Sequence, residues 1–159
     1  MEFDFLVPID NEIIDYKNHL SSQHIGGVMA LHTDDAFPDL SEVKIALVGV
    51  LENRGDEGVA TVVDLTSVRK SLYGLFMGNW KMGIADLGDI LAGNSTMDTY
   101  FAVKKVVASL IKKGIVPIVI GGSQDLTYAL YRAYDELEQM VNLVAIDNKF
   151  DFGKETDRL

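Results

Sequence analysis

Short apolar runs recur along the chain from Lys44 onward. The clearest span residues 44–50, 115–120 and 142–146, and they are apolar nearly throughout instead of alternating with polar positions. Parallel strands that are covered on both faces have this pattern, because neither face meets water. The pattern predicts buried parallel strands in these runs, and a weaker strand at 84–87 that precedes a turn-like Gly-Asp pair.

Longer segments with apolar residues at helical spacing lie between and after these runs. They span residues 66–76, 96–113 and 125–140. The second has Ser95 or Thr96 as its N-cap and Gly114 as its stop signal. On the first, the apolar residues that fall on one side are Val68, Leu72, Leu75 and Phe76. Each segment is therefore predicted to be a helix that packs through an apolar face.

The order strand, helix, strand, helix predicts the fold class. Right-handed crossovers in this order give a parallel sheet with helices on both faces, an α/β three-layer arrangement. Residues 1–42 show no sustained period, and we expect an arm or covering segment there and one α/β domain over 43–159. Four strands are few for this architecture, so the sequence is expected to hold only part of a larger fold.

Composition narrows the classes of partner. The chain has 159 residues and a formal charge of −10, which argues against nucleic acid because phosphate binding needs a basic face. No apolar stretch reaches the ~20 residues that cross a bilayer, and the acidic N-terminus does not have the pattern of a signal peptide. Cysteine is absent, which excludes thiolate chemistry and agrees with a cytoplasmic location.

Two loops follow predicted strands at the edge where α/β proteins bind ligands. Residues 121–127, G-G-S-Q-D-L-T, come directly after one strand, and residues 146–151, I-D-N-K-F-D, come at the end of the last one. Ligands in open α/β sheets sit outside the carboxyl ends of the strands. These loops are therefore the first places to look for a site.

Five segments in order resemble the ureohydrolase family of arginases, agmatinases and formimidoylglutamases. V-P-I-V-I-G-G and the L-T-Y-A-L that follows resemble the family's P-I-V-L-G-G-D-H-S segment, and I-D-N-K-F-D resembles its I-D-A-H-x-D. Residues 44–50 match its first strand, 59–71 its Gly-rich stretch and G-P-x-A-I-R helix, and 86–90 its D-x-G-D turn. The resemblance covers residues 43–153 and implies the arginase-like fold, represented by its N-terminal portion only.

The resemblance also implies a manganese pair, and here the sequence departs from the family. The family's metal ligands are a His in the first motif, Asp, His and Asp in the second, and two Asp in a third that would lie beyond the end of this chain. Gln124 stands at the first histidine, with Ser123 where the family has Asp. Asp147 and Asp151 keep the two carboxylates of the second motif, but Lys149 replaces the histidine between them.

These replacements disfavour metal binding. Manganese prefers carboxylate and imidazole ligands, whereas Gln124 offers a neutral amide oxygen and a protonated Lys149 offers no lone pair. We therefore expect no cofactor in this chain, although Asp147 and Asp151 could still hold one metal ion weakly. Lys149 is instead predicted to be a counter-ion that replaces the metal between the two carboxylates.

Other candidate residues have simpler structural interpretations. Gly121 and Gly122 could form an anion-binding turn, but tight strand-to-helix packing accounts for them better. Asp125 is a shifted ligand or, more simply, a first-turn acid that favours the helix dipole. Trp80 is expected to be a packing anchor. The only histidines, His19, His24 and His32, have no ligand spacing, so we expect solvated or partly packed side chains.

Two functions from different classes follow. The first is a non-catalytic homologue that acts through its surface or as a subunit of an assembly. The alternative is a manganese-dependent hydrolase of amidine or guanidine C–N bonds in small-molecule substrates, as the resemblance implies. Self-association into a homo-oligomer is also implied by the resemblance alone.

Overall fold

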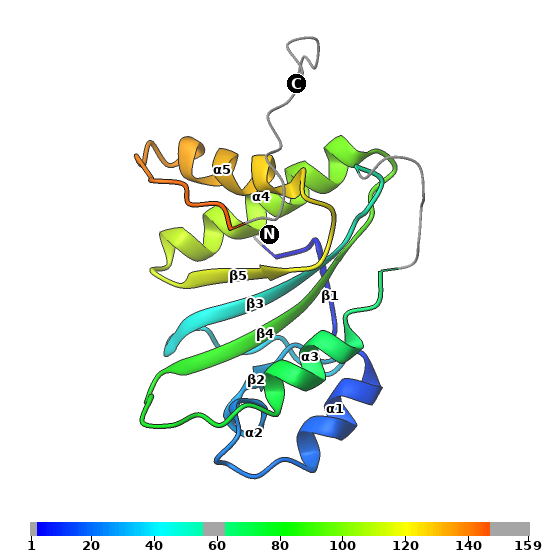
Figure 1. Ribbon diagram of the computed structural model, residues 1–159, viewed down its shortest axis with the longest axis vertical. Coiled ribbons are helices and arrows are strands. Elements are labelled where there is room, and N and C mark those ends of the chain that lie inside the picture. The colour runs from blue at the N-terminus through cyan, green and yellow to red at the C-terminus, as the bar shows by residue number, and fades with distance from the viewer. Residues whose placement is uncertain (1–2, 56–62, 147–159) are drawn as a thin grey trace.

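The computed structural model describes residues 3–55 and 63–146 (Figure 1). Five strands and five helices form in this part of the chain. In order they are β1 (Leu6–Val7), α1 (Asn11–Asn18), α2 (Ile25–Val28), β2 (Ala30–Leu31), β3 (Val43–Leu51), α3 (Thr66–Tyr73), β4 (Gly83–Leu91), α4 (Thr96–Lys112), β5 (Val116–Ile120) and α5 (Leu126–Glu136).

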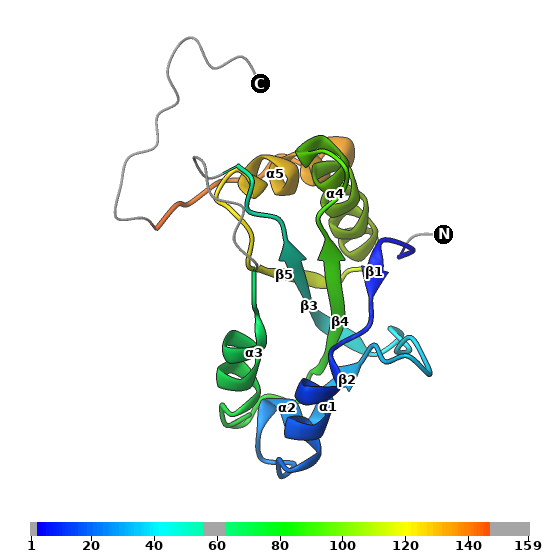
Figure 2. The ribbon, with the colours of Figure 1, turned by 90° about the vertical axis from the view of Figure 1, so that its right-hand side faces the viewer.

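The strands form one mainly parallel sheet in the order β1-β4-β3-β5. β3 lies in parallel between β4 and β5, β2 also pairs with β4 in parallel, and only the short β1 is antiparallel. Helices cover both faces: α4 and α5 lie on one side of the sheet, and α1 and α3 on the other (Figures 1 and 2). The predicted α/β three-layer arrangement is therefore confirmed.

Alternate residues of β3 pack into two separate hydrophobic clusters, one on each face of the sheet. Ala46, Val48 and Val50 pack in the cluster that includes the buried face of α4 and α5. Leu47 packs instead with Ile13 and other residues of the α1 and α3 side. This is the period of two that a strand covered on both faces requires. No described helix has the length and apolar character needed to span a membrane.

The ends of α4 follow the predicted signals. Ser95 is the N-cap and forms a capping box with Asp98, in which each side chain accepts a hydrogen bond from the other residue's backbone N–H. Gly114 follows the helix with φ of +72°, a conformation that glycine adopts without steric cost.

Two predicted elements differ in extent. β4 is a nine-residue strand, and Gly88 and Asp89 lie inside it instead of forming a turn. α3 ends at Tyr73, and its buried residues are Arg69 and Tyr73, while the predicted apolar position Val68 is 42% exposed. The prediction failed because polar groups of this helix find buried partners on β4, which an apolar count cannot detect.

The prediction of a strand at 142–146 is wrong. These residues form no strand and are exposed, and Val144 is 80% exposed. The neighbouring β5 is itself partly bare, with Val116 59% and Ile118 41% exposed. Because β5 is itself partly exposed, a further strand beside it would also leave apolar side chains in contact with water.

The part of the N-terminal segment that is described, residues 3–42, packs directly on the sheet. It contributes β1 and β2, which both pair with β4, and α1, which contacts α3. None of these elements is predicted from the sequence, because each is short and shows no sustained period. The boundary between 1–42 and 43–159 as separate units stays a prediction.

Candidate functional site

Loops from three strands meet at the carboxyl edge of the sheet. The guanidinium of Arg54, after β3, donates to the carbonyl oxygens of Gly93 (2.7 Å) and Asn94 (3.1 Å), which follow β4. The backbone N–H of Ser123, after β5, donates to the carbonyl oxygen of Glu52 at 2.9 Å. These hydrogen bonds fix the three loops together at the edge where an α/β fold places its ligands.

Glu52 is a fully buried carboxylate directly after β3. Its Oε1 accepts from the Nε and from the backbone N–H of Arg54, both at 2.9 Å, and its Oε2 accepts from Arg54 Nη2 and from Thr99 Oγ1 at 2.5 and 2.8 Å. The hydrogen bond from Arg54 is the main cause that lowers the pKa of Glu52 to about 2. Each carboxylate oxygen already accepts two hydrogen bonds, so Glu52 is committed to structure.

A second buried ionic cluster joins α3 to β4. Arg69 donates from Nε to Asp86 Oδ2 at 2.8 Å and from Nη2 to Asp86 Oδ1 at 3.2 Å. Tyr73, one turn further along α3, donates its hydroxyl to Asp86 Oδ2 at 2.9 Å, and the Gly88 N–H donates to Oδ1 at 3.1 Å. Burial and the charge of Asp86 raise the pKa of Tyr73, so the phenol stays protonated.

The same arginine reaches Asp89 near the end of β4. Arg69 Nη1 lies 2.9 Å from Asp89 Oδ1 and donates to Oδ2 at 3.1 Å. Burial raises the pKa of Asp89 above its usual value, although the charge of Arg69 acts in the opposite direction. The carboxylate lies against Gly49 of β3, where any Cβ would collide with it. Close backbone packing therefore holds Asp89 in place.

The predicted Gly-Gly turn has the tight geometry expected of it. Gly121 and Gly122 both have positive φ, +82° and +78°. A Cβ on Gly121 would come within 2.6 Å of Leu65, and one on Gly122 would collide with Leu126 of α5. The two glycines bring β5 and α5 close together, and the side chain of Leu65 lies over the turn.

The residues after this turn include two of the predicted site positions. Ser123 is buried, and its hydroxyl has no hydrogen-bond partner among the described residues. Gln124, at the position of the family's first histidine, is exposed. Asp125 is the N-cap of α5, one position before the predicted first turn, and accepts a hydrogen bond from the hydroxyl of Tyr100. Burial, followed by this contact, raises the pKa of Tyr100 to about 12.

The remaining predicted positions are Asp147, Lys149 and Asp151, which lie outside the described residues. The histidines are held in different places: His19 Nδ1 donates to the carbonyl oxygen of Asp15, and His32 Nδ1 to that of Leu87. Within residues 3–55 and 63–146, no group of three or more His, Asp or Glu side chains could hold a metal ion.

The donor set at the described carboxyl edge does not fit a manganese pair. Manganese is held by carboxylate and imidazole groups with free lone pairs. Here the carboxylates of Glu52 and Asp89 are bound to arginines, as is that of Asp86 in the middle of β4. Ser123 and Gln124 offer a hydroxyl and a neutral amide. At this edge the negative charges of the carboxylates are neutralised by arginine side chains.

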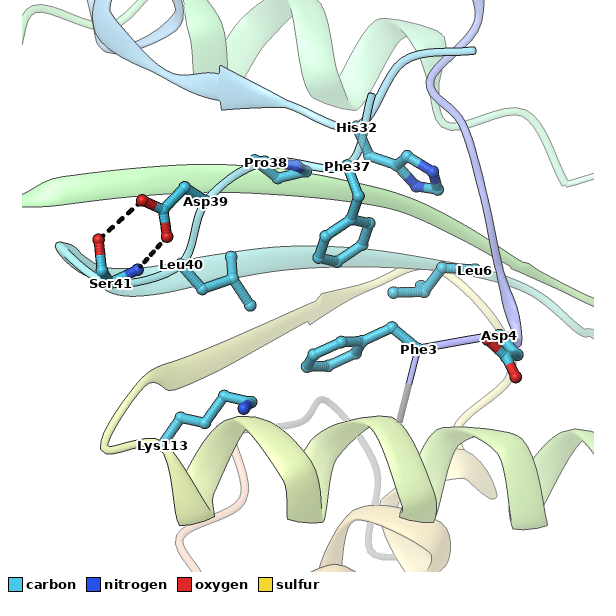
Figure 3. A pocket seen from close by; sticks show the side chains of 10 residues that line it. All are labelled: Phe3, Asp4, Leu6, His32, Phe37, Pro38, Asp39, Leu40, Ser41 and Lys113. Carbon is cyan, nitrogen blue, oxygen red and sulfur yellow. Dashed lines mark hydrogen bonds between the residues drawn. The ribbon is translucent and has the colours of Figure 1, made fainter. Parts of the chain in front are cut away.

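A separate hollow lies away from this edge. It has a volume of about 960 Å³ and is seen in Figure 3 between the strands and the end of α4. The ring of Phe37 stacks on Phe3 at 5.3 Å and meets His32 edge-on at 4.9 Å. Asp39 accepts two hydrogen bonds from Ser41, both at 2.9 Å. The aromatic side chains that line this hollow come from the N-terminal segment, not from the loops that carry the predicted site.

The parallel sheet with helices on both faces and a Gly-Gly turn at its carboxyl edge defines an α/β protein. A sequence model of the arginase family matches residues 61–158, more than half of the chain. The chain belongs to the arginase family. The crystal structure of agmatine ureohydrolase from Thermoplasma volcanium is similar in fold, with a TM-score of 0.50 and 21% sequence identity.

That match covers 76% of this chain and 41% of the agmatine ureohydrolase chain, so the sequence spans less than half the length of this relative. No curated protein sequence matches the chain. The family assignment therefore rests on the sequence model, and the solved structure adds the fold.

The residues that form the two ionic clusters were not predicted from the sequence: Glu52, Arg54, Arg69 and Tyr73. Two signals were available. Arg69 and Tyr73 are four residues apart and so lie on one face of α3, a spacing suited to contact with a common partner. Glu52 directly follows an apolar strand and therefore had to be either exposed or paired.

Proposed function

We propose that this chain is a non-catalytic member of the arginase family. The observation that carries the proposal is the loop after β5. Its Gly-Gly turn keeps the geometry that positions a ligand loop, yet it presents the buried hydroxyl of Ser123 and the exposed amide of Gln124. Neither side chain is a strong manganese ligand, and the resemblance places a carboxylate and an imidazole at these positions.

The surrounding charges support this proposal. A metal pair needs carboxylates that remain free to coordinate it. The acids at the described edge are instead paired with arginines of the same chain, as in Glu52 with Arg54 and Asp89 with Arg69. The proposed role of Lys149 as counter-ion to Asp147 and Asp151 would extend the same replacement of metal by an internal cation.

The competing function is manganese-dependent hydrolysis of amidine or guanidine C–N bonds. The test is turnover by the purified chain after loading with manganese, with arginine, agmatine and formimidoylglutamate as substrates and release of urea or formamide as the readout. The proposal predicts no release above the rate with the buffer and metal alone. Turnover of any of the three that depends on manganese would overturn it.

A further inference from the structure

Helices α4 and α5 lie side by side on one face of the sheet (Figures 1 and 2). Between them is a hollow of about 300 Å³, the size at which small-molecule sites begin. We call it the α4–α5 hollow. Six of the side chains that line it are aromatic, cationic or a methionine: Met97, Tyr100, Phe101, Lys104, Tyr128 and Arg132.

The apolar side of this hollow suits a flat ring. The rings of Tyr100 and Tyr128 meet edge to face, with their centres 6.4 Å apart. Phe101 is 50% exposed and Met97 63% exposed, so both have surface left to bury. Aromatic rings and methionine side chains pack favourably against a further ring.

The two cations of the hollow are held in place against its rings. Lys104 Nζ lies 5.7 Å from the centre of the Phe101 ring and 2.9 Å from Glu136 Oε2. The guanidinium of Arg132 lies 5.9 Å from the centre of the Tyr128 ring and donates from Nη1 to its hydroxyl at 3.3 Å. An ammonium has three donors and a guanidinium five, so donors remain for a ligand. Their fixed positions lower the entropy cost of binding.

The charge at the hollow is opposite to that of the whole chain. Among the described residues that line it, the charged side chains are cations, whereas the chain carries −10. Glu136 is shared by Lys104 and Lys105, at 2.9 and 2.8 Å, so one carboxylate faces two ammonium groups. Arg132 lies 3.4 Å from Asp135, but both side chains are about half exposed and water screens the pair. A positive excess beside aromatic rings favours an anion.

We propose that the α4–α5 hollow binds a small aromatic phosphate, in which a single ring carries a phosphate group. The ring would pack among Tyr128, Phe101 and Met97. Arg132 lies one turn of α5 before Glu136, the residue that holds Lys104, so both cations line the same part of the hollow. A phosphate has three acceptor oxygens and can accept from both. The site uses none of the loops at the carboxyl edge, so it is independent of whether the chain is catalytic.

The experiment is a titration of the full chain with phenyl phosphate, followed by the NMR shifts of its backbone amides. Phenol and inorganic phosphate, the two halves of this probe, are titrated in parallel. The expected result is one saturable site for phenyl phosphate, with the largest shifts on α4 and α5. Each half should bind at least about tenfold more weakly, because each lacks one set of contacts. No saturable binding of phenyl phosphate, or equally tight binding of either half, would overturn the proposal.

Two neighbouring lysines provide a matched pair of variants. Lys104→Gln and Lys105→Gln each remove one ammonium from Glu136, but of the two only Lys104 lines the hollow. Lys104→Gln should weaken the binding of phenyl phosphate about tenfold, and Lys105→Gln should leave it nearly unchanged. Equal weakening by both would reveal only a general attraction of anions and contradict the site.

A third variant tests the hollow without touching an ion pair. Met97→Glu changes a side chain that is 63% exposed and places a carboxylate beside the proposed phosphate. It should abolish the binding of phenyl phosphate, because like charges repel. Circular dichroism melts check that all three variants fold. Unchanged binding by Met97→Glu would place the ligand elsewhere and overturn the proposal.

Discussion

Arg69 on α3 and Asp86 in the middle of β4 form a two-pronged ion pair between the helix and the sheet. The Nε–Oδ2 and Nη2–Oδ1 distances are 2.8 and 3.2 Å, and both residues are buried. A buried ion pair adds little net stability, because its formation removes two charges from water. Removal of one partner is costly, since the other charge is left buried and unpaired.

Arg69→Met should therefore lower the free energy of unfolding by about 3–5 kcal/mol. Urea denaturation measures this change. Arg132→Met is the matched control, because Arg132 is exposed on α5, and its effect should stay within about 0.5 kcal/mol. A loss below about 1 kcal/mol for Arg69→Met would contradict the ion-pair account.

Tyr73→Phe tests the third member of this cluster. The variant keeps the ring but removes the hydroxyl that donates to Asp86, which leaves a buried carboxylate oxygen with one hydrogen bond fewer. The expected loss is about 1–3 kcal/mol in the free energy of unfolding. Tyr131→Phe, at a position that is 50% exposed on α5, should change it little. Equal effects of the two substitutions would rule out a special role for the Tyr73 hydroxyl.

The Glu52–Arg54 pair predicts how stability depends on pH. The pKa of Glu52 is lowered from 4.5 to about 2 in the folded chain, so the unfolded chain binds the proton more readily. The contribution to stability is full above pH 4.5 and is lost as pH falls toward 2. Arg54→Gln should raise this pKa and flatten the loss over that window. Unfolding free energies measured at a series of pH values should differ in slope between the two proteins, and identical slopes would exclude this assignment.

The counter-ion role of Lys149 is a prediction from sequence. Lys149→Ala should lower the free energy of unfolding, because two neighbouring carboxylates would lose their shared cation, while Lys149→Arg should retain most of the stability. Lys113→Ala, at the C-cap of α4, is a comparison outside the motif. Unchanged stability of Lys149→Ala in thermal melts would end the hypothesis.

Local patterns predicted those parts of the fold whose causes are local. β3 and β5 were found because their residues are apolar in an unbroken run, and α4 because its capping box and terminal glycine are sequence signals. The full length of β4 was missed because the pair Gly88-Asp89 has the composition of a turn. In the structure Gly88, with φ of +87°, lies inside the strand. The buried face of α3 was missed because its partners are charges on a strand that lies later in the chain.

The place of the candidate loop in the fold could be predicted from the sequence, but the side chains that surround it could not. Ser123 and Gln124 lie between β5 and α5, as the predicted order of strand and helix requires. The arginines that neutralise Glu52, Asp86 and Asp89 come from other segments, and only tertiary structure brings them together. Likewise, only the tertiary structure shows that Trp80, between α3 and β4, is 64% exposed, which contradicts the prediction of a packing anchor.

Calorimetric titration of the wild-type chain with manganese tests the central claim most directly. The variant Ser123→Asp/Gln124→His/Lys149→His is titrated under the same conditions. It restores the family's ligand types at three positions and should bind the ion more tightly. No saturable heat is expected for the wild type under conditions in which the variant binds. Stoichiometric, saturable binding of manganese by the wild type would contradict it.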